Sequence, residues 1–220
     1  MPTLLVTGAN RGIGLELARQ YAADGWEVVA TAREPDKADE LNDLDCKVET
    51  LDVADQTSVD AFLERLGDRK IDLFINNAGV GGGLDLTRET WLHTLEVNSV
   101  APALLARALK PNVAASDRKK MVVITSRMGS IADNDGGGFW VYRSSKAAVN
   151  AAWKSIALDF KGDGIAVAML HPGWVQTDMG GPNAQIDTAT SVAGMRKVID
   201  GLSLDNTGEF RAYDGAAIDW

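Results

Sequence analysis

The sequence has little cysteine, little histidine and fewer basic than acidic residues. Cys46 is the only cysteine, so an intrachain disulfide is impossible and a reducing compartment is indicated. His93 and His171 are the only histidines, and neither has ligand partners at metal spacing, so we expect no metal site. The chain has 22 Lys and Arg against 31 Asp and Glu, a net charge of −9. This balance argues against nucleic acid or an anionic membrane as the main partner.

Long hydrophobic runs and low-complexity segments are also missing. No apolar stretch reaches the length of about 20 residues that a membrane span needs. The opening residues MPTLLVTGAN carry no basic leader, so they do not form a signal peptide. We therefore expect a cytoplasmic protein. Because 220 residues with 45% hydrophobic content show no internal repeat and no linker, we expect one domain over residues 1–220.

Short apolar runs alternate with helical patterns along the chain, which is typical of a parallel sheet covered on both faces. Right-handed crossovers between such strands generate the doubly wound architecture. The sequence therefore predicts an α/β fold, a single doubly wound Rossmann domain of about seven parallel strands with helices on both faces. The expected strands are 3–7, 27–32, 47–53, 71–76, 120–125, 165–170 and 208–213. The expected helices are 12–23, 36–44, 56–67, 87–114, 140–161 and 185–200.

A glycine-rich turn, VTGANRGIG, joins the first expected strand to the first helix. It contains Gly8, Gly12 and Gly14, a spacing that differs from the G-x-G-x-x-G of many Rossmann proteins. A backbone without Cβ atoms can approach a pyrophosphate closely, and a helix N-terminus offers free N–H groups. Because the turn lies between strand and helix, we expect it to bind a dinucleotide.

The end of the second expected strand indicates which dinucleotide is bound. An acidic residue usually stands there in NAD-binding folds and binds the ribose 2′-OH. Here the strand ends at Ala32, and Arg33 follows. Arg11, in the glycine turn, can reach the same corner. Two guanidinium groups without a carboxylate suit a 2′-phosphate, so we expect NADPH, with a plain surface charge as the alternative for Arg33.

Tyr142 and Lys146 are four residues apart in WVYRSSKAAVN, where they would share one face of a helix. An ammonium group beside a phenol lowers the phenol's pKa from its usual value of about 10. Such a phenol could donate a proton near neutral pH. Taken alone, the pair could equally be two amphipathic side chains on a solvated face.

Seven motifs along nearly the whole chain carry a resemblance to a known family. They are TGANRGIG (7–14), LDV (51–53), NNAG (76–79), VNS (97–99), ITS (124–126), YRSSK (142–146) and HPGWVQTDM (171–179). In order and spacing they resemble the short-chain dehydrogenase/reductase family. GEFRAYDGAAIDW and PGWVQTDMGG look like its C-factor, sniffer and carbonyl-reductase branch. The resemblance implies an NADP(H)-dependent enzyme that reduces a carbonyl to an alcohol by hydride transfer.

The resemblance implies catalytic roles for four residues. Tyr142 would donate a proton to the substrate oxygen, and Lys146 would bind the nicotinamide ribose and lower the pKa of Tyr142. Ser126 would hold the substrate carbonyl as a preorganised donor. Ser126 and Tyr142 are farther apart than is usual in the family, so Ser130 stays an alternative.

Asn98 would be the fourth catalytic residue. Pro102, four residues later, has no N–H for the Asn98 carbonyl to accept. The resemblance implies that this carbonyl holds a water that links Lys146 to solvent. A kinked helix with a locally satisfied amide is the alternative.

The resemblance also implies a set of cofactor contacts. Asp52 would hold the adenine, and Pro172 would help to seat the nicotinamide. Local roles are the alternatives, because Asp52 could cap a turn and Pro172 could break the chain. The expected cofactor-binding residues are Gly8, Asn10, Arg11, Gly12, Ile13, Gly14, Arg33, Asp52, Val53, Asn77, Ala78, Gly79, Tyr142, Lys146, Pro172, Val175 and Thr177.

Aromatic and thioether side chains flank the expected site in sequence. They suit an apolar or aromatic ketone, aldehyde or quinone, although packing in the core or at a subunit contact is the alternative. Between Ser126 and Tyr142, the glycine-rich segment 132–139 is expected to be a mobile loop, either a flap over the substrate or a plain connector. The flanking residues are Met128, Phe139, Trp140, Trp174 and Met179.

Two further expectations come from the resemblance. The chain would form a homodimer or homotetramer through its fourth and fifth helices. Its function could also be that of a C-factor-type signalling or sensor protein, which binds NADP(H) but turns over little.

Overall fold

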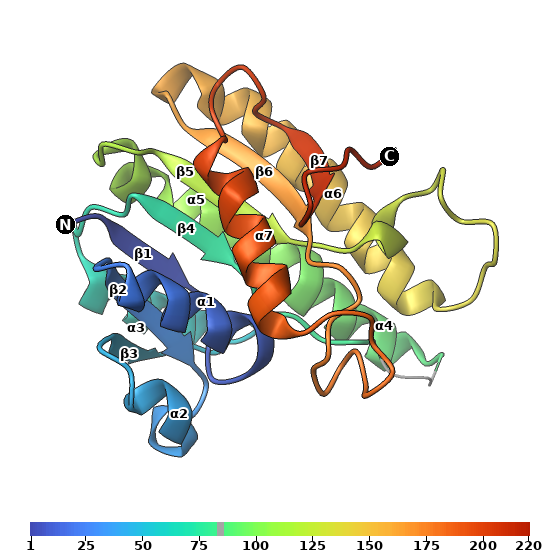
Figure 1. The fold of residues 1–220 in the computed structure, drawn as a ribbon, viewed down its shortest axis with the longest axis horizontal. Helices are drawn as coiled ribbons and strands as arrows, with labels where there is room; N and C mark the ends of the chain where they lie inside the picture. Colours follow the sequence, from blue (N-terminus) through green and yellow to red (C-terminus); the bar gives the residue numbers. More distant parts are fainter. Residues whose placement is uncertain (83–85) are drawn as a thin grey trace.

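The computed structural model describes all of residues 1–220 except 83–85. Seven strands in the described residues form one sheet in the order β3-β2-β1-β4-β5-β6-β7, and every neighbouring pair is parallel (Figure 1). The predicted doubly wound α/β fold is therefore confirmed. The strands are β1 (Thr3–Val6), β2 (Glu27–Ala32), β3 (Lys47–Thr50), β4 (Leu73–Asn76), β5 (Lys120–Ile124), β6 (Ala166–His171) and β7 (Glu209–Ala212).

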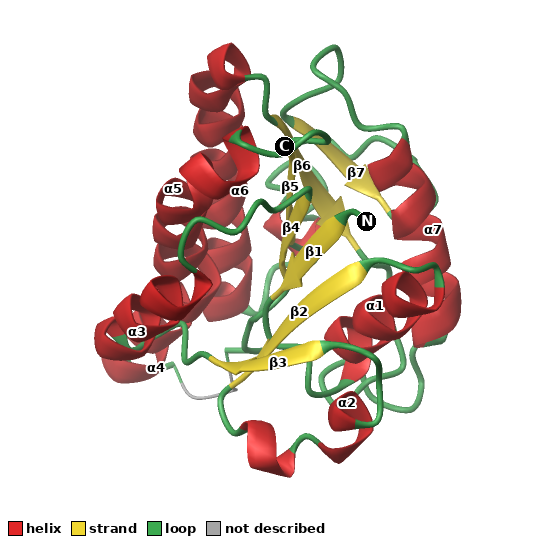
Figure 2. Cartoon of the chain, turned by 90° about the vertical axis from the view of Figure 1, so that its left-hand side faces the viewer, coloured by secondary structure: helices red, strands yellow, loops and turns green. Residues whose placement is uncertain are grey.

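Helices cover both faces of the sheet (Figure 2). One face carries α1 (Gly12–Ala23) and α7 (Thr188–Asp200), and the other carries α3 (Gln56–Leu66), α5 (Ala101–Ala114) and α6 (Trp140–Phe160). Alternation along the strands explains this arrangement, because successive side chains point to opposite faces. Leu4 and Val6 of β1 belong to the hydrophobic cluster under α1 and α7, whereas Leu5 belongs to the cluster under α3, α5 and α6.

The winding of the chain reverses between β1 and β4, since β1 pairs with β2 on one side and with β4 on the other. In open α/β sheets, ligands bind in the crevice at the carboxyl ends of the strands where the order reverses. The glycine turn follows β1, and the NNAG motif lies at the end of β4. The fold therefore gathers motifs that are far apart in sequence at one edge of the sheet.

Helix 12–23 has the predicted bounds, and the expected helices 56–67, 140–161 and 185–200 differ from α3, α6 and α7 by at most three residues at either end. The expected helix 36–44 is instead a 3-10 turn (Pro35–Lys37) followed by the four-residue α2 (Asp39–Asn42).

The expected continuous helix 87–114 was wrong. The chain forms α4 (Arg88–Leu95), a π-helical turn (Glu96–Val100) and then α5. The missing N–H of Pro102 takes away the helical partner of the Asn98 carbonyl. The Asn98 side chain also bonds to the chain at Val80, outside the helix. Such single π turns inside helices often occur at functional sites.

Strand β3 was predicted over 47–53 but ends at Thr50. The Asp52 N–H donates to Ser58 Oγ (2.9 Å), and its carboxylate accepts from the Ala54 N–H (3.0 Å). These local bonds turn the chain away from the sheet.

Across the described part of the chain, no helix is long and apolar enough to cross a membrane. In the same part, no group of three His, Cys, Asp or Glu residues is arranged to hold a metal ion.

Candidate active site

The glycine turn packs tightly against the residues that follow β4. Gly8 has a φ of +64°, and a Cβ added there would lie 2.9 Å from the Cα of Ala78. A Cβ on Gly14 would lie 2.3 Å from the carbonyl oxygen of Gly8 and 2.5 Å from Asn77 Nδ2. All three distances are too short for real contacts, so only glycine permits this close approach.

The N-terminus of α1 begins in this turn. Arg11 is its N-cap residue in an extended conformation, and its side chain makes no capping hydrogen bond. The first N–H groups of the helix therefore stay available to an anion, as they do in known dinucleotide-binding turns. Thr177 comes to the same place from the loop after β6, because a Cβ on Gly12 would lie 3.3 Å from Thr177 Cγ2. Bare glycines at an uncapped helix N-terminus fit a pyrophosphate.

Asn77, directly after β4, stabilises the glycine turn through hydrogen bonds. Its amide donates to the carbonyls of Thr7 and Gly8, both at 3.0 Å. The Thr7 hydroxyl accepts the N–H groups of Asn77 (3.0 Å) and Ala78 (3.1 Å). Sequence reasoning missed Thr7, although a hydroxyl directly before the first glycine was a usable signal. The Asn77 side-chain amide therefore holds the turn itself.

The residues expected to select NADPH over NADH lie at the end of β2 and in the glycine turn. Ala32 is buried and Arg33 is exposed. The guanidinium of Arg11 forms an ion pair with Asp178, and both side chains are exposed. Exposed pairs of this kind contribute little energy, so Arg11 can exchange Asp178 for another anion. Arg33 directly follows β2, at the place where the sequence predicted the contact with a 2′-phosphate.

The remaining predicted cofactor residues lie around this edge of the sheet. The Asp52 carboxylate already accepts the Ala54 N–H, which is the turn-capping alternative considered for it. Pro172 and Val175 are buried in the loop after β6, and the Pro172 carbonyl accepts the Ser191 hydroxyl (2.5 Å). Asn10 is exposed in the glycine turn, Ile13 packs partly against the core under α1, and Val53 and Gly79 follow β3 and β4.

Two serines lie between β5 and α6. Ser126 caps a 3-10 turn (Arg127–Gly129), where its hydroxyl accepts the Met128 N–H (3.1 Å). The nearby Ser126 hydroxyl holds the pKa of the Tyr142 phenol below the value that burial alone would give. The Ser130 hydroxyl accepts the Asp133 N–H (3.0 Å), inside its own loop. Ser126 is therefore the serine that the fold brings to Tyr142.

Tyr142 and Lys146 lie on α6, as expected, but the electrostatics differ from the expectation. Burial raises the pKa of Tyr142, and it lowers the pKa of Lys146 to about 8. Lys146 Nζ lies 5.6 Å from the centre of the Tyr142 ring and donates to the Ile124 carbonyl (3.1 Å). The expectation that Lys146 lowers the pKa of Tyr142 was wrong for the protein alone, because desolvation dominates for both groups.

Asn98 connects three parts of the site. Its Oδ1 accepts the Val80 N–H (2.8 Å), and its Nδ2 donates to the Val80 carbonyl (2.9 Å) and to Ser145 Oγ (3.0 Å). The Ser145 hydroxyl in turn donates to the Tyr142 carbonyl (2.8 Å). The side-chain amide of Asn98 is thus locally satisfied in a helix that a π turn interrupts, which is the alternative considered for this residue. Sequence reasoning missed Ser145, which is fully buried directly before Lys146.

The aromatic and thioether residues predicted to flank the site are mostly exposed. Phe139 is 63%, Trp140 58%, Trp174 49% and Met179 57% exposed, and Met128 is partly buried. These side chains do not form the core, so packing in the core was the wrong alternative for the four exposed ones.

A hollow of about 700 Å³ lies elsewhere, between α7 and the chain around β7. Lys197, Arg211 and Tyr213 are among its lining residues, and none of the predicted site residues lines it. This hollow is therefore separate from the edge of the sheet described above.

Comparison with known proteins supports the same assignment. The family model described as short chain dehydrogenase matches residues 2–187. The C-signal protein of Myxococcus xanthus is 40% identical over 164 residues, which cover 73% of this chain and 99% of that protein. The carbonyl reductase Sniffer of D. melanogaster has a TM-score of 0.92 at 32% identity and covers 100% of both chains. An NADPH-bound carbonyl reductase from chicken fatty liver has a TM-score of 0.93 at 33% identity, with coverage of 100% of this chain and 99% of that one.

Proposed function

The chain belongs to the short chain dehydrogenase family, and from this premise we propose that it is an NADPH-dependent carbonyl reductase. Its substrate is an apolar or aromatic ketone, aldehyde or quinone, which it reduces to an alcohol. The observation that carries the proposal is the meeting of Ser126, Tyr142 and Lys146 at the carboxyl end of β5, on the edge of the sheet that also bears the glycine turn.

NADPH, when bound, supplies a hydride to the carbonyl carbon. Tyr142 supplies the proton that the developing alkoxide needs. A raised pKa keeps this proton on the phenol at neutral pH, so Tyr142 is ready to act as an acid. The Ser126 hydroxyl lies at the same place and holds the substrate oxygen, which orients the carbonyl for proton transfer.

Lys146 has two tasks in this proposal. Its ammonium binds the ribose next to the nicotinamide, and its charge stabilises the phenolate that proton donation leaves behind. The pKa of Lys146 is about 8, so the group can pass a proton near neutral pH. The backbone carbonyl of Asn98, freed by Pro102, holds the water through which the proton is replaced from solvent.

Cofactor preference follows from the end of β2. The exposed guanidinium of Arg33 binds the 2′-phosphate, and the buried Ala32 presents no carboxylate to repel it. The chicken carbonyl reductase, which is described as NADPH-bound, supports the same cofactor.

Turnover tests the proposal directly. The purified protein is incubated with NADPH and a panel of apolar aldehydes, ketones and quinones, and the loss of NADPH absorbance is followed. Carbonyl-dependent oxidation of NADPH, with NADH a much poorer donor, is the expected result. Absence of oxidation across the panel, with NADPH bound, would favour the second candidate function.

That second candidate is a signalling or sensor protein that binds NADP(H) and turns over little. The similarity to the C-signal protein favours it. The bonds from Asn98 to Ser145 and from Ser145 to the Tyr142 carbonyl hold the helix that places Tyr142 and Lys146 near Ser126. This arrangement favours the enzyme, because proton transfer needs it and cofactor binding alone does not.

We further propose that residues 1–220 act as one cytoplasmic domain that assembles as a homodimer or homotetramer through α5 and α6. Leu104 on α5 and Leu158 on α6 are 50% and 62% exposed, which suits burial against a second copy. Light scattering on the purified protein measures the assembly.

A further inference from the structure

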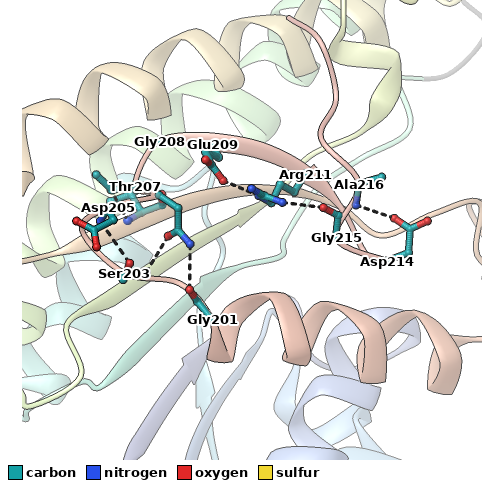
Figure 3. Close-up of polar contacts among 12 residues, drawn as sticks. Gly201, Ser203, Asp205, Thr207, Gly208, Glu209, Arg211, Asp214, Gly215 and Ala216 are labelled. Carbon is teal, nitrogen blue, oxygen red and sulfur yellow. Dashed lines mark hydrogen bonds and ion pairs between the residues drawn. The ribbon is translucent and has the colours of Figure 1, made fainter.

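Segment 213–220 folds back along β7 after a tight turn. The Ala212 N–H donates to the Ala216 carbonyl (2.8 Å), and the Ile218 N–H donates to the Phe210 carbonyl (3.0 Å). Side chains hold the turn as well (Figure 3): Arg211 donates to the Gly215 carbonyl (2.8 Å), and the Ala216 N–H donates to the Asp214 carboxylate (3.1 Å). The position of the residues that follow is therefore fixed relative to the sheet.

Trp220 is held in place from two sides. Its ring lies 5.6 Å from the ring of Phe210, centre to centre, and Phe210 is a buried residue of β7. Lys154 of α6 places its Nζ 5.8 Å from the Trp220 ring and also donates to the Gly208 carbonyl (3.0 Å). Stacking and cation–π contacts of this kind stabilise an exposed ring.

The backbone of Trp220 reaches the loop that leads into α6. Its carbonyl accepts the N–H of Ala132 at 3.0 Å. Ala132 lies in the loop 131–139, which joins the Ser126 turn to α6 and ends directly before Trp140. Figure 1 shows the end of the chain on the same side of the molecule as this loop.

The loop 131–139 makes few other contacts with the rest of the protein. Residues 131–139 are exposed, and Cβ atoms added at Gly136, Gly137 and Gly138 would meet nothing within 4 Å. Other polar contacts are local, such as the Asp133 N–H with Ser130 and the Gly137 N–H with Asn134. Among the described residues, the bond to Trp220 is the one hydrogen bond that ties segment 131–138 to a distant part of the chain.

We infer that Trp220 is a positioning residue, which holds the loop 131–139 in the place where it contacts a carbonyl substrate. The inference rests on the proposed function. The indole ring anchors Trp220 on β7 and α6. The backbone carbonyl of Trp220 then fixes the loop at Ala132. Among the described residues, Trp220 makes no hydrogen bond or ring contact with Tyr142 or the glycine turn. Its effect is therefore on substrate binding and leaves NADPH affinity unchanged.

Hydrogen exchange and kinetics on three variants test the inference. Trp220→Ala removes the ring, Trp220→Phe keeps an aromatic ring against Phe210, and Asp219→Ala changes the exposed neighbouring residue as the matched control. Hydrogen exchange over 131–139 is expected to be about fivefold faster in Trp220→Ala. This factor corresponds to the free energy that roughly one hydrogen bond contributes. The KM for the carbonyl is expected to rise by a similar factor, with the Kd for NADPH unchanged. Trp220→Phe and Asp219→Ala are expected to behave like the parent.

Two results would overturn the inference: parent-like exchange over 131–139 in Trp220→Ala, or equally fast exchange in Asp219→Ala. The exchange measurement needs no turnover. A parent protein that oxidises no NADPH would count against the proposed function, while the exchange result would still decide the role of Trp220.

Discussion

Lys146 Nζ lies 5.6 Å from the centre of the Tyr142 ring, and its hydrogen bond goes to the Ile124 carbonyl at the end of β5. The lysine is thus held near the phenol by the sheet and not by the phenol itself. Burial raises the pKa of Tyr142, so the phenol is neutral at pH 7, and it lowers the pKa of Lys146 only to about 8, so the ammonium is still mostly protonated there. This state suits a site that donates a proton, because the phenol keeps its hydrogen until a substrate oxygen needs it.

Cofactor preference depends on the end of β2. Arg33→Ala is expected to weaken NADPH binding by about 1.5–3 kcal/mol, the usual value for a hydrogen bond to a charged group, and to leave NADH binding almost unchanged. Ala32→Asp is expected to shift preference toward NADH, because a carboxylate repels the 2′-phosphate. Titration of each variant with both cofactors measures the effect. Equal kcat/KM for NADPH and NADH in the parent would contradict the assignment.

The glycine turn offers a matched pair of substitutions. Gly8 and Gly25 both have positive φ, at +64° and +76°, but only a Cβ on Gly8 would meet another atom within 4 Å. Each change to alanine is expected to cost about 1–2 kcal/mol for the left-handed backbone. Gly8→Ala is expected to cost more and to abolish NADPH binding, since the turn must move away from Ala78. Denaturant unfolding and NADPH titration of both variants provide the comparison. Equal losses of stability and of NADPH affinity in the two variants would show that the close packing at Gly8 is unimportant.

The buried ammonium of Lys146 gives a pH-dependent stability. Its pKa of about 8 in the folded protein lies below the value of about 10.4 in an unfolded chain. Between these pH values the unfolded chain binds the proton and the folded chain does not, so the free energy of unfolding rises with pH. Lys146→Met lacks this rise. The stability of Lys146→Met relative to the parent is therefore expected to be greatest at pH 7 and to fall toward pH 10. A difference that does not change with pH would refute the buried-charge account.

The loop 131–139 is expected to close over a bound substrate. Its exchange should slow when NADPH and a carbonyl ligand are bound together, and NADPH alone should have a smaller effect. Peptide-level hydrogen exchange on the parent protein measures this. If exchange is fast and unchanged by ligands, the segment is a connector only.

Local patterns predicted the sheet and most helices because the apolar runs and helical periods were unambiguous. Helix 12–23 had its bounds correctly predicted, since Gly12 and Gly14 follow a strand and a clear helical period comes next. Helix 87–114 could not be predicted correctly, because the π turn depends on contacts of Asn98 with Val80 and Ser145, 18 and 47 residues away. Long-range contacts of this kind override local helical preference.

The sequence predicted which residues form the site more completely than it predicted their pKa values and hydrogen bonds. Spacing placed Tyr142 and Lys146 on one helix face, but the direction of the pKa shift in Tyr142 depends on burial, which a motif does not show. Similarly, the sequence offered Ser126 and Ser130 as alternatives, and the fold directs the Ser130 hydroxyl to Asp133. The contact between Trp220 and Ala132 had no sequence signal, because it joins two segments with no shared motif.

The central claim is that Tyr142 donates the proton in carbonyl reduction. Tyr142→Phe keeps the ring and the helix and removes the hydroxyl that would do the chemistry. Steady-state kinetics of this variant, with NADPH and the best carbonyl of the panel, provide the test. Loss of a general acid typically costs about 10²–10⁴-fold, so kcat is expected to fall by that factor while the Kd for NADPH stays close to the parent value. A Tyr142→Phe protein that reduced the carbonyl at the parent rate would contradict the account.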